Sequence, residues 1–268
     1  MKAESIAGGA LEREADERAD DAPLAAARSR PLLIRYGKHL RGGFDRLIAA
    51  SSLVPDEAVL DVRDFAWTQQ LRENWQAIRD EALAAALAPD ATPPLAAISP
   101  DHRAIAHPAK WRSCFLWGYG YSVPENIHRC PVTASLVEGI PGLNSAFFSI
   151  LAPGTHIPPH RGVTKGLITC HLGLIIPRDG DARMRLEDRV VRWAEGETLI
   201  FDDTRDHEVW NDTSGTRIVL AIQFRRPLRN PGRWIAESLL GLVRRSAFVQ
   251  EARANLRVWS QENRALEH

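Results

Sequence analysis

The chain has 268 residues, 44% of them hydrophobic and 25% charged, which is the composition of a globular protein with room for one substantial core. Lysine and arginine together number 34, as do aspartate and glutamate, so the net charge gives no basis for a nucleic-acid partner. No apolar stretch approaches the roughly 20 residues needed to cross a bilayer, and the charged N-terminus lacks the apolar region of a secretory signal. These features predict a cytoplasmic protein.

The N-terminal part is predicted to be helical after a disordered tail. Residues 1–28 are rich in Ala, Glu, Asp and Arg without an apolar period, which is typical of disorder. Residues 31–50 carry apolar side chains at spacings of three and four, which predicts an amphipathic helix interrupted at Gly42 and Gly43. Residues 64–88 show the clearest helical pattern in the chain, and Pro89 is expected to end that helix.

Short apolar runs separated by turn residues predict strands between residues 112 and 226. The runs are "CFLWGYG", "SAFFSILA", "LITCHLGLIIP", "VVRWAEGETLIF" and "RIVLAIQFRRP". Many short strands without helices between them indicate an antiparallel sandwich or barrel, and the helical pattern returns after the last run. We therefore predict one domain over residues 29–268, with a helical part at 29–110, a β core at 111–228 and a C-terminal helix at 229–268.

The cysteines and two tryptophans are expected to be structural. Cys114, Cys130 and Cys170 are odd in number and form no CxxC pair, so neither a disulfide framework nor a thiolate zinc site is expected. We predict buried or half-buried free thiols. Trp193 and Trp210 are predicted mainly as core residues.

Histidines beside the predicted strands are candidate metal ligands. His160 lies in "GTHIPPHRGVTKG", which we predict to be a loop, and His171 and His207 lie in or beside later strands. Imidazole is a common ligand of iron, and double-stranded barrels commonly bring a loop histidine and a later strand histidine together. The spacing alone is weak evidence, because a histidine near a strand is more often a hydrogen-bonded structural residue.

Arg217, at the start of the last apolar run, is a candidate anion-binding residue. A guanidinium that projects from a strand into a barrel mouth has to meet an anion, because burying it unpaired is costly. The carboxylate of a cosubstrate, bound by two parallel hydrogen bonds, is a natural partner. The alternative is an exposed or internally salt-bridged strand end.

A more specific signal comes from the segments "FFSILAPGTHIPPHRG", "HLGLIIP", "WAEGETLIFDDTRDHEVWNDT" and "TRIVLAIQFRRPL". Together they resemble the aspartyl/asparaginyl β-hydroxylase family, a branch of the Fe(II)- and 2-oxoglutarate-dependent dioxygenases, over residues 112–228. Similarity to the bacterial lipid A acyl-chain hydroxylase branch extends upstream to "NWQAIRDEALA". The resemblance implies a mainly β fold, with a double-stranded β-helix core of the jelly-roll or cupin type and flanking α-helices.

The resemblance implies an Fe(II) site with two protein ligands, His160 and His207. Most of the wider superfamily adds an aspartate two residues after the first histidine, but this chain has Gly162 there. In the branch that the chain resembles, water fills this vacancy, and His156 is not a ligand. Because two neutral imidazoles leave the full metal charge, we expect iron and the dianionic 2-oxoglutarate to depend on each other.

Nearby carboxylates are poor substitutes for the missing ligand. Glu208 adjoins His207, and adjacent side chains on a strand point to opposite faces. Asp202 and Asp203 lie at the turn before His207 and are expected to be turn-forming acids. Asp206 is, with Asp203 and Glu208, a candidate for the substitute carboxylate.

For 2-oxoglutarate, the resemblance implies Ser149 and Arg217 as partners of the distal carboxylate, and His171 near the carboxylate beside the metal. Family members often carry an arginine two residues before the position of His171. This chain has Thr169 there, so Lys165 is a candidate substitute, with substrate binding as its other possible role.

The implied reaction inserts one oxygen atom of O2 into a C–H bond of the substrate and releases succinate and CO2. A lipid acyl chain is one candidate substrate, and free or carrier-bound aspartate or asparagine, or a peptide, is another. A non-catalytic cupin-like binding protein is the alternative, but such a protein would not need His160, His207, Ser149 and Arg217 together. The sequence leaves the acceptor and the oligomeric state open.

Basic amphipathic stretches flank the predicted β core. Helices of this kind can lie on an anionic membrane surface, which would place the protein peripherally on the inner membrane. The alternative is helices packed on the barrel with solvated arginines. The basic residues are Arg28, Arg30, Arg35, Lys38, Arg41 and Arg46 before the core, and Arg233, Arg244, Arg245, Arg253 and Arg257 after it.

Overall fold

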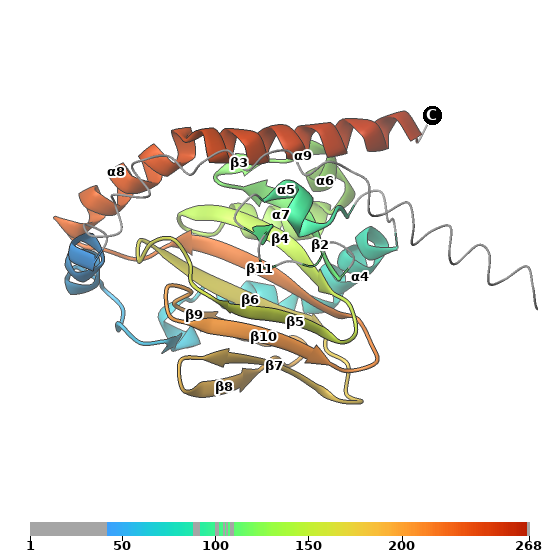
Figure 1. Ribbon diagram of the computed structural model, residues 1–268, viewed down its shortest axis with the longest axis horizontal. Helices are drawn as coiled ribbons and strands as arrows, with labels where there is room; N and C mark the ends of the chain where they lie inside the picture. Colours follow the sequence, from blue (N-terminus) through green and yellow to red (C-terminus); the bar gives the residue numbers. More distant parts are fainter. Residues whose placement is uncertain are drawn as a thin grey trace, which may run out of the picture. The chain divides into compact units, whose positions relative to one another are not determined.

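A computed structural model describes residues 42–87, 92–99, 102, 103, 105, 107 and 110–266, and the fold belongs to the unit Gly43–His268 (Figure 1). The predicted tail at 1–28 and residues 29–41 lie outside the described residues. Residues 42–50 are helical, so Gly42 and Gly43, which we expected to interrupt a helix, are part of one.

A seven-stranded antiparallel sheet forms the larger layer, in the order β1-β9-β6-β11-β4-β2-β3 (Figure 1). The bounds are β1 Val59–Leu60, β2 Trp111–Gly118, β3 Tyr121–Ser122, β4 Leu143–Leu151, β6 Leu167–Ile175, β9 Thr198–Phe201 and β11 Arg217–Arg225. Its central strands are the most apolar runs of the sequence, because they are covered on both faces.

A four-stranded sheet, in the order β5-β10-β7-β8, forms the smaller layer. The bounds are β5 Thr155–His160, β7 Asp181–Leu186, β8 Arg189–Arg192 and β10 His207–Asp212. Apart from the hairpin β7–β8, consecutive strands from β4 to β11 alternate between the two sheets. This is the arrangement of a double-stranded β-helix, and the predicted fold class is confirmed.

The core lies on both faces of the larger sheet, because side chains alternate along its strands. On β11, Ile218 and Leu220 pack on the outer, helix-covered face. Val219 and Ala221 point inward and pack with Met184 of β7. Polar side chains on the inner face of the larger sheet are therefore enclosed between the two sheets, and the candidate site is built there.

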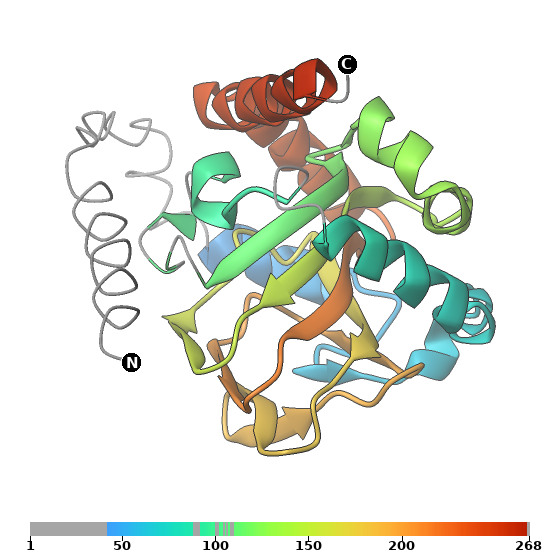
Figure 2. The same ribbon diagram turned by 90° about the vertical axis from the view of Figure 1, so that its right-hand side faces the viewer.

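Helices cover the outer face and one edge of the larger sheet (Figure 2). α4 and α7 pack on the outer face, and α9 packs against α5. Within the described residues, no helix has the length and apolarity to cross a membrane. The bounds are η1 Val62–Asp64, α3 Thr68–Glu73, α4 Trp75–Ala86, α5 Leu95–Ile98, α6 Pro124–Arg129, α7 Pro131–Glu138, α8 Gly232–Arg245 and α9 Ala247–Leu266.

Two predicted helices are each divided. The pattern at 64–88 predicted one helix, but the backbone leaves the helical region at Asn74, where φ is −108°, and α3 ends there. The Asn74 side-chain amide donates to the carbonyl of Gln70 at 2.8 Å and satisfies an end of α3. The C-terminal helix is divided at Ser246, where ψ is 149°.

Three strands of the smaller sheet, β5, β7 and β10, lie outside the predicted apolar runs. The segment of β5 was predicted as a loop because it contains Pro158 and Pro159. Proline is tolerated there because β5 is an edge strand, and both prolines fall at a register shift between the pairs His207↔His160 and Val209↔Ile157. β7 is short and half charged, so its alternation is weak.

The burial of the cysteine and tryptophan side chains can be compared with the predictions from the sequence. All three cysteines are buried free thiols, as predicted. Trp193 is a core residue with 5% of its surface exposed. The prediction for Trp210 was wrong, because its ring stacks on His156 at 5.0 Å and lies under the guanidinium of Arg183, outside the core.

Candidate active site

His160 and His207 lie side by side in the smaller sheet. His160 ends β5 and His207 begins β10, and the two residues are cross-strand partners. Their ring centroids are 4.1 Å apart and the ring planes are inclined by 50°. The structure therefore brings together the two imidazoles that the sequence singled out.

Both imidazoles are held in the same way. The Nδ1 of His160 is 2.9 Å from the carbonyl oxygen of Pro158, and the Nδ1 of His207 is 2.9 Å from that of Arg205. A carbonyl accepts only, so each Nδ1 carries the proton and each Nε2 keeps its lone pair. Burial, and then the neighbouring His207, lower the pKa of His160 to about 4, and burial also lowers the pKa of His207. Both rings are neutral near pH 7, as metal ligands must be.

Arg217 is buried at the start of β11 without a carboxylate partner among the described residues. Its side chain is 1% exposed, and its guanidinium lies 4.5 Å over the ring of Trp193. Nη1 donates to Ser149 Oγ at 3.4 Å, while the buried Nε has no hydrogen-bond partner. Burial lowers the pKa of Arg217 to about 9, so the group is still charged at pH 7. A buried cation of this kind requires an anion that enters from outside.

Aromatic side chains connect the arginine with the imidazole pair. The Trp193 Nε1 donates to the Nδ1 of His171 at 3.2 Å, so the ring that lies under Arg217 also orients His171. His171 packs edge-on against Phe201 at 5.0 Å, and Phe201 contacts His207 at 5.9 Å. Contacts between neighbouring rings therefore connect the two halves of the candidate site.

Asp203 lies against Gly162, the position of the missing carboxylate. A Cβ atom on Gly162 would be 2.1 Å from Asp203 Oδ1, and the Gly162 N–H donates to the Asp203 carbonyl oxygen at 2.6 Å. Asp203 Oδ2 accepts from Thr169 Oγ1 at 2.9 Å and from Gln223 Nε2 at 3.0 Å, while Oδ1 is buried without a partner. Burial raises the pKa of Asp203 to about 6. The expectation of a simple turn-forming acid was wrong for Asp203.

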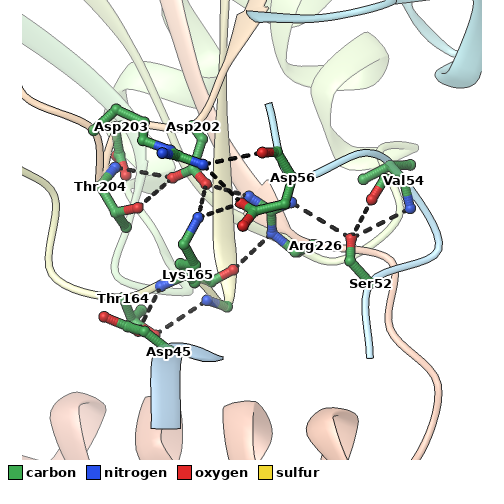
Figure 3. Close-up of polar contacts among 12 residues, drawn as sticks. Asp45, Ser52, Val54, Asp56, Thr164, Lys165, Asp202, Asp203, Thr204 and Arg226 are labelled. Atoms are coloured by element: carbon green, nitrogen blue, oxygen red, sulfur yellow. Dashed lines mark hydrogen bonds and ion pairs between the residues drawn. The ribbon is translucent and has the colours of Figure 1, made fainter. Parts of the chain in front are cut away.

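Thr169 contacts this carboxylate, and Lys165 does not replace the family arginine. The Lys165 ammonium pairs with Asp56 and, at 2.8 Å, with Asp202 Oδ2, which removes it from the cosubstrate side (Figure 3). Asp202 is itself fully buried and pairs with Arg226 at 2.6 Å. The Lys165 ammonium is therefore engaged in ion pairs with Asp56 and Asp202, whereas the sequence suggested contact with the cosubstrate or the substrate.

The same network fixes the two chain segments that flank the imidazoles (Figure 3). Arg226 Nε donates to the Lys165 carbonyl at 2.8 Å and thereby holds the segment after His160. Asp202 Oδ1 accepts from the N–H of Thr204 at 3.0 Å and shapes the turn before His207. That turn ends at Arg205, whose carbonyl orients the His207 ring.

Glu208 and His156 lie on the other face of the smaller sheet. Glu208 pairs with His156 at 3.1 Å and with the guanidinium of Arg185, as its position next to His207 predicted. Asp206 pairs with Arg185 at 3.0 Å. These contacts occupy both acids outside the space between the sheets.

The residues fit the cofactors that the sequence implied. Two neutral imidazoles with free Nε2 atoms suit a divalent iron, and the unpaired Arg217 guanidinium beside Ser149 suits a carboxylate. Among the described residues, no three or more His, Cys, Asp and Glu side chains gather as a metal site.

Three participants were missed in the sequence. Asp203 was predicted as a turn-forming acid, and Trp193 was predicted only as a core residue. Trp111, whose Nε1 donates to Ser149 Oγ at 3.0 Å, was not among the predicted site residues. The signal for Asp203 was available in the doubled acid of "FDDT". The two indoles had no distinguishing signal, because burial and hydrogen bonding of tryptophan are ordinary.

Comparison with known proteins gives a consistent result. The aspartyl/asparaginyl beta-hydroxylase family matches residues 72–227, more than half of the chain. An ornithine lipid ester-linked acyl 2-hydroxylase of Rhizobium tropici is 38% identical over 76% of this chain and 73% of that protein. The human aspartyl/asparaginyl beta-hydroxylase is 33% identical over 61% of this chain, but the match spans only 21% of the human protein.

Solved structures overlap with the fold only in part. The cupin domain of Schizosaccharomyces pombe Cnp3 gives a TM-score of 0.29 at 10% identity, covering 43% of this chain and 64% of that one. KdgF from a Halomonas species gives 0.29 at 12% identity, covering 46% and 83%. The fold assignment accordingly rests on the strand order.

Proposed function

Since the chain belongs to the aspartyl/asparaginyl β-hydroxylase family, it is a hydroxylase of the 2-oxoglutarate-dependent dioxygenase class, and we propose that it hydroxylates a lipid acyl chain at carbon 2. The observation that carries the substrate is the 38% identity with the ornithine lipid acyl 2-hydroxylase over most of both chains. The human relative matches over a shorter part of this chain, so a peptide or a free amino acid is the second candidate.

We assign the roles as follows. His160 and His207 would hold Fe(II) through their Nε2 atoms, and Arg217 with Ser149 would bind the distal carboxylate of 2-oxoglutarate. His171, oriented by Trp193, would lie near the carboxylate beside the metal. When bound, Fe(II) couples the decarboxylation of 2-oxoglutarate by O2 to insertion of one oxygen atom into a substrate C–H bond.

The protein side chains contribute binding and orientation. Arg217 donates the charge-assisted hydrogen bonds that a carboxylate of the dianion accepts, and its burial makes the gain large because no carboxylate among the described residues competes. Asp203 lies against Gly162 and occupies the room that a side chain there would need. A protein that only bound a ligand would need neither the paired imidazoles nor their carbonyl anchors, which favours the enzyme over a cupin-like binder.

The decisive assay measures succinate and hydroxylated product together. The purified full-length chain is incubated with Fe(II), 2-oxoglutarate and O2 and offered ornithine lipid, lipid A precursors, aspartate, asparagine or a peptide. We expect hydroxylated acyl chains, found by mass spectrometry, in proportion to succinate. Product on aspartate, asparagine or the peptide instead would overturn the lipid assignment.

A lipid substrate implies contact with a bilayer, and we propose that residues 29–268 act as one dioxygenase domain with α8 as its membrane-facing helix. Trp234 and Leu242 of α8 are 63% and 54% exposed, and the exposed Arg245 ends the helix. Apolar side chains with a basic end suit the anionic cytoplasmic surface. Co-flotation with anionic but not with neutral vesicles, lost in Trp234→Ser with Leu242→Ser, tests it.

A further inference from the structure

A third imidazole, His102, packs against Trp111, which donates a hydrogen bond to Ser149 of the candidate active site. It follows α5, far from both candidate ligands in the sequence. Burial, and then the electrostatic influence of His160 and His207, lower the pKa of His102 to about 4. No motif in the sequence pointed to this residue.

Hydrogen bonds fix one edge of the His102 ring. Its Nδ1 lies 2.7 Å from Ser99 Oγ, which in turn lies 2.9 Å from the hydroxyl of Tyr119. The ring packs edge-on against Trp111, with centroids 5.3 Å apart and planes at 87°. Trp111 also donates to Ser149, which accepts a hydrogen bond from Arg217, so His102 is connected to Arg217 through Trp111 and Ser149.

The opposite edge of the ring carries Nε2, for which the described residues provide no hydrogen-bond partner. A neutral imidazole carries one proton on one of its two ring nitrogens. The direction of the hydrogen bonds between Tyr119, Ser99 and Nδ1 determines which nitrogen carries it. Donation from Tyr119 to Ser99 and from Ser99 to Nδ1 leaves the proton on Nε2, and the reverse order leaves it on Nδ1. In the first order the ring offers one N–H donor at its free edge.

We propose that His102 is a substrate-positioning residue whose Nε2–H donates to the ester carbonyl oxygen of the acyl chain, next to the carbon that is hydroxylated. The inference rests on the proposed function and deepens it. Carbon 2 of an ester-linked acyl chain is bonded to the carbonyl carbon and lies two bonds from the carbonyl oxygen. A hydrogen bond to that oxygen therefore restricts the position of carbon 2. Long acyl chains have no other polar atom near the reacting carbon by which an enzyme can set the position of attack.

The test compares His102→Phe, which keeps a ring but removes the donor, with His102→Gln, which keeps an amide N–H. The control is His128→Phe, on the exposed face of α6. For each protein, KM for ornithine lipid and the ratio of hydroxylated lipid to succinate are measured. Mn(II) and 2-oxoglutarate affinities are measured without lipid.

We expect His102→Phe to raise KM roughly tenfold, the value of one lost hydrogen bond in a desolvated site, and to lower the ratio of product to succinate. Mn(II) and 2-oxoglutarate affinities should stay within about twofold of wild type. His102→Gln should recover most of the ratio, and the control should match wild type. If His102→Phe does not fold, Ser99→Ala, which frees Nδ1, should lower the ratio in the same direction.

Two outcomes overturn the inference. One is a wild-type KM and ratio in His102→Phe, and the other is a loss of Mn(II) or 2-oxoglutarate affinity, which would give His102 a role at the metal or the cosubstrate. Failure of the proposed function is a separate result, because it appears as absence of hydroxylated lipid with the wild-type protein.

Discussion

Gly162 has no space for a side chain, and this decides how the imidazole pair can be altered. The Cβ of Gly162→Asp would lie 2.1 Å from Asp203 Oδ1, and moving Asp203 breaks its hydrogen bonds from Thr169 and Gln223. Two carboxylates would also share one buried site. We therefore expect Gly162→Asp to form succinate at less than about a tenth of the wild-type rate at saturating iron and 2-oxoglutarate.

Gly162→Ala separates the two causes, because it introduces the Cβ without the charge. A milder loss in Gly162→Ala than in Gly162→Asp assigns the difference to the second carboxylate. Wild-type turnover in Gly162→Asp would show that the chain tolerates a three-ligand site, contrary to this account.

His160 and His207 are expected to be indispensable for metal binding, whereas His156 is not. His156→Ala removes a half-exposed ring that pairs with Glu208 on the outer face, so Mn(II) binding and succinate formation should stay near wild type. His160→Ala and His207→Ala each leave one imidazole, and both activities should disappear. Electron paramagnetic resonance of bound Mn(II) measures metal binding directly. Full activity in His160→Ala would contradict the ligand assignment.

Arg217 is expected to determine the affinity for 2-oxoglutarate. Arg217→Ala removes the buried cation and leaves a cosubstrate carboxylate unpaired, which should weaken binding roughly a hundredfold in calorimetry with Mn(II) present. Arg217→Lys keeps the charge but not the planar fork, so an intermediate affinity is expected. Unchanged affinity in Arg217→Ala would mean that another cation holds the carboxylate.

At the scale of elements, the network around Asp202 joins β9, the start of β6 and the end of β11. Asp202→Asn removes the anion that Arg226 and Lys165 share, and leaves the fully buried Arg226 without its carboxylate. Breaking a buried pair in this way costs about 3 kcal/mol of unfolding free energy. Urea unfolding should show this loss, and Mn(II) affinity should fall with it, because the turn before His207 is released.

Asp61→Asn is the matched control for that variant. It removes the carboxylate that pairs with Arg63 on the surface, and an exposed pair of this kind contributes little. Unfolding of Asp61→Asn should therefore be close to wild type. Equal behaviour of the two variants would show that burial of the Asp202 network does not matter for stability.

For the whole molecule, the partly buried His102 predicts a loss of stability in mild acid. Its pKa is lowered to about 4 in the folded protein, from 6.5 in a free chain. Between these values the unfolded chain binds a proton that the folded protein does not, so stability falls as pH falls through this window and is fully present above it. From pH 7 to pH 5 this one group accounts for about 2 kcal/mol.

His102→Gln cannot titrate, so its unfolding free energy should decline less than that of the wild type between pH 7 and pH 5. Denaturant unfolding of the metal-free proteins at both pH values measures the difference. Parallel curves for the two proteins would contradict the burial of a neutral His102.

Local patterns in the sequence were sufficient for the fold class and for part of the site. Apolar runs such as "LITCHLGLIIP" correspond to β6, because a strand covered on both faces needs apolar residues whatever its partners. The pairing of His160 with His207 agrees with the choice of these two residues, which rested on the family resemblance. The burial of Arg217 agrees with its choice as an anion-binding residue at the start of an apolar run.

Only the tertiary structure decided which distant residues meet. That β5 is a strand despite two prolines depends on its edge position, and the contact between Gly162 and Asp203 depends on how the loop after β5 meets the turn after β9. His102 packs against Trp111, which strand β2 brings within hydrogen-bonding distance of Ser149. Local propensity carries no information about such contacts, because the free energy that selects them comes from burial and pairing across the whole core.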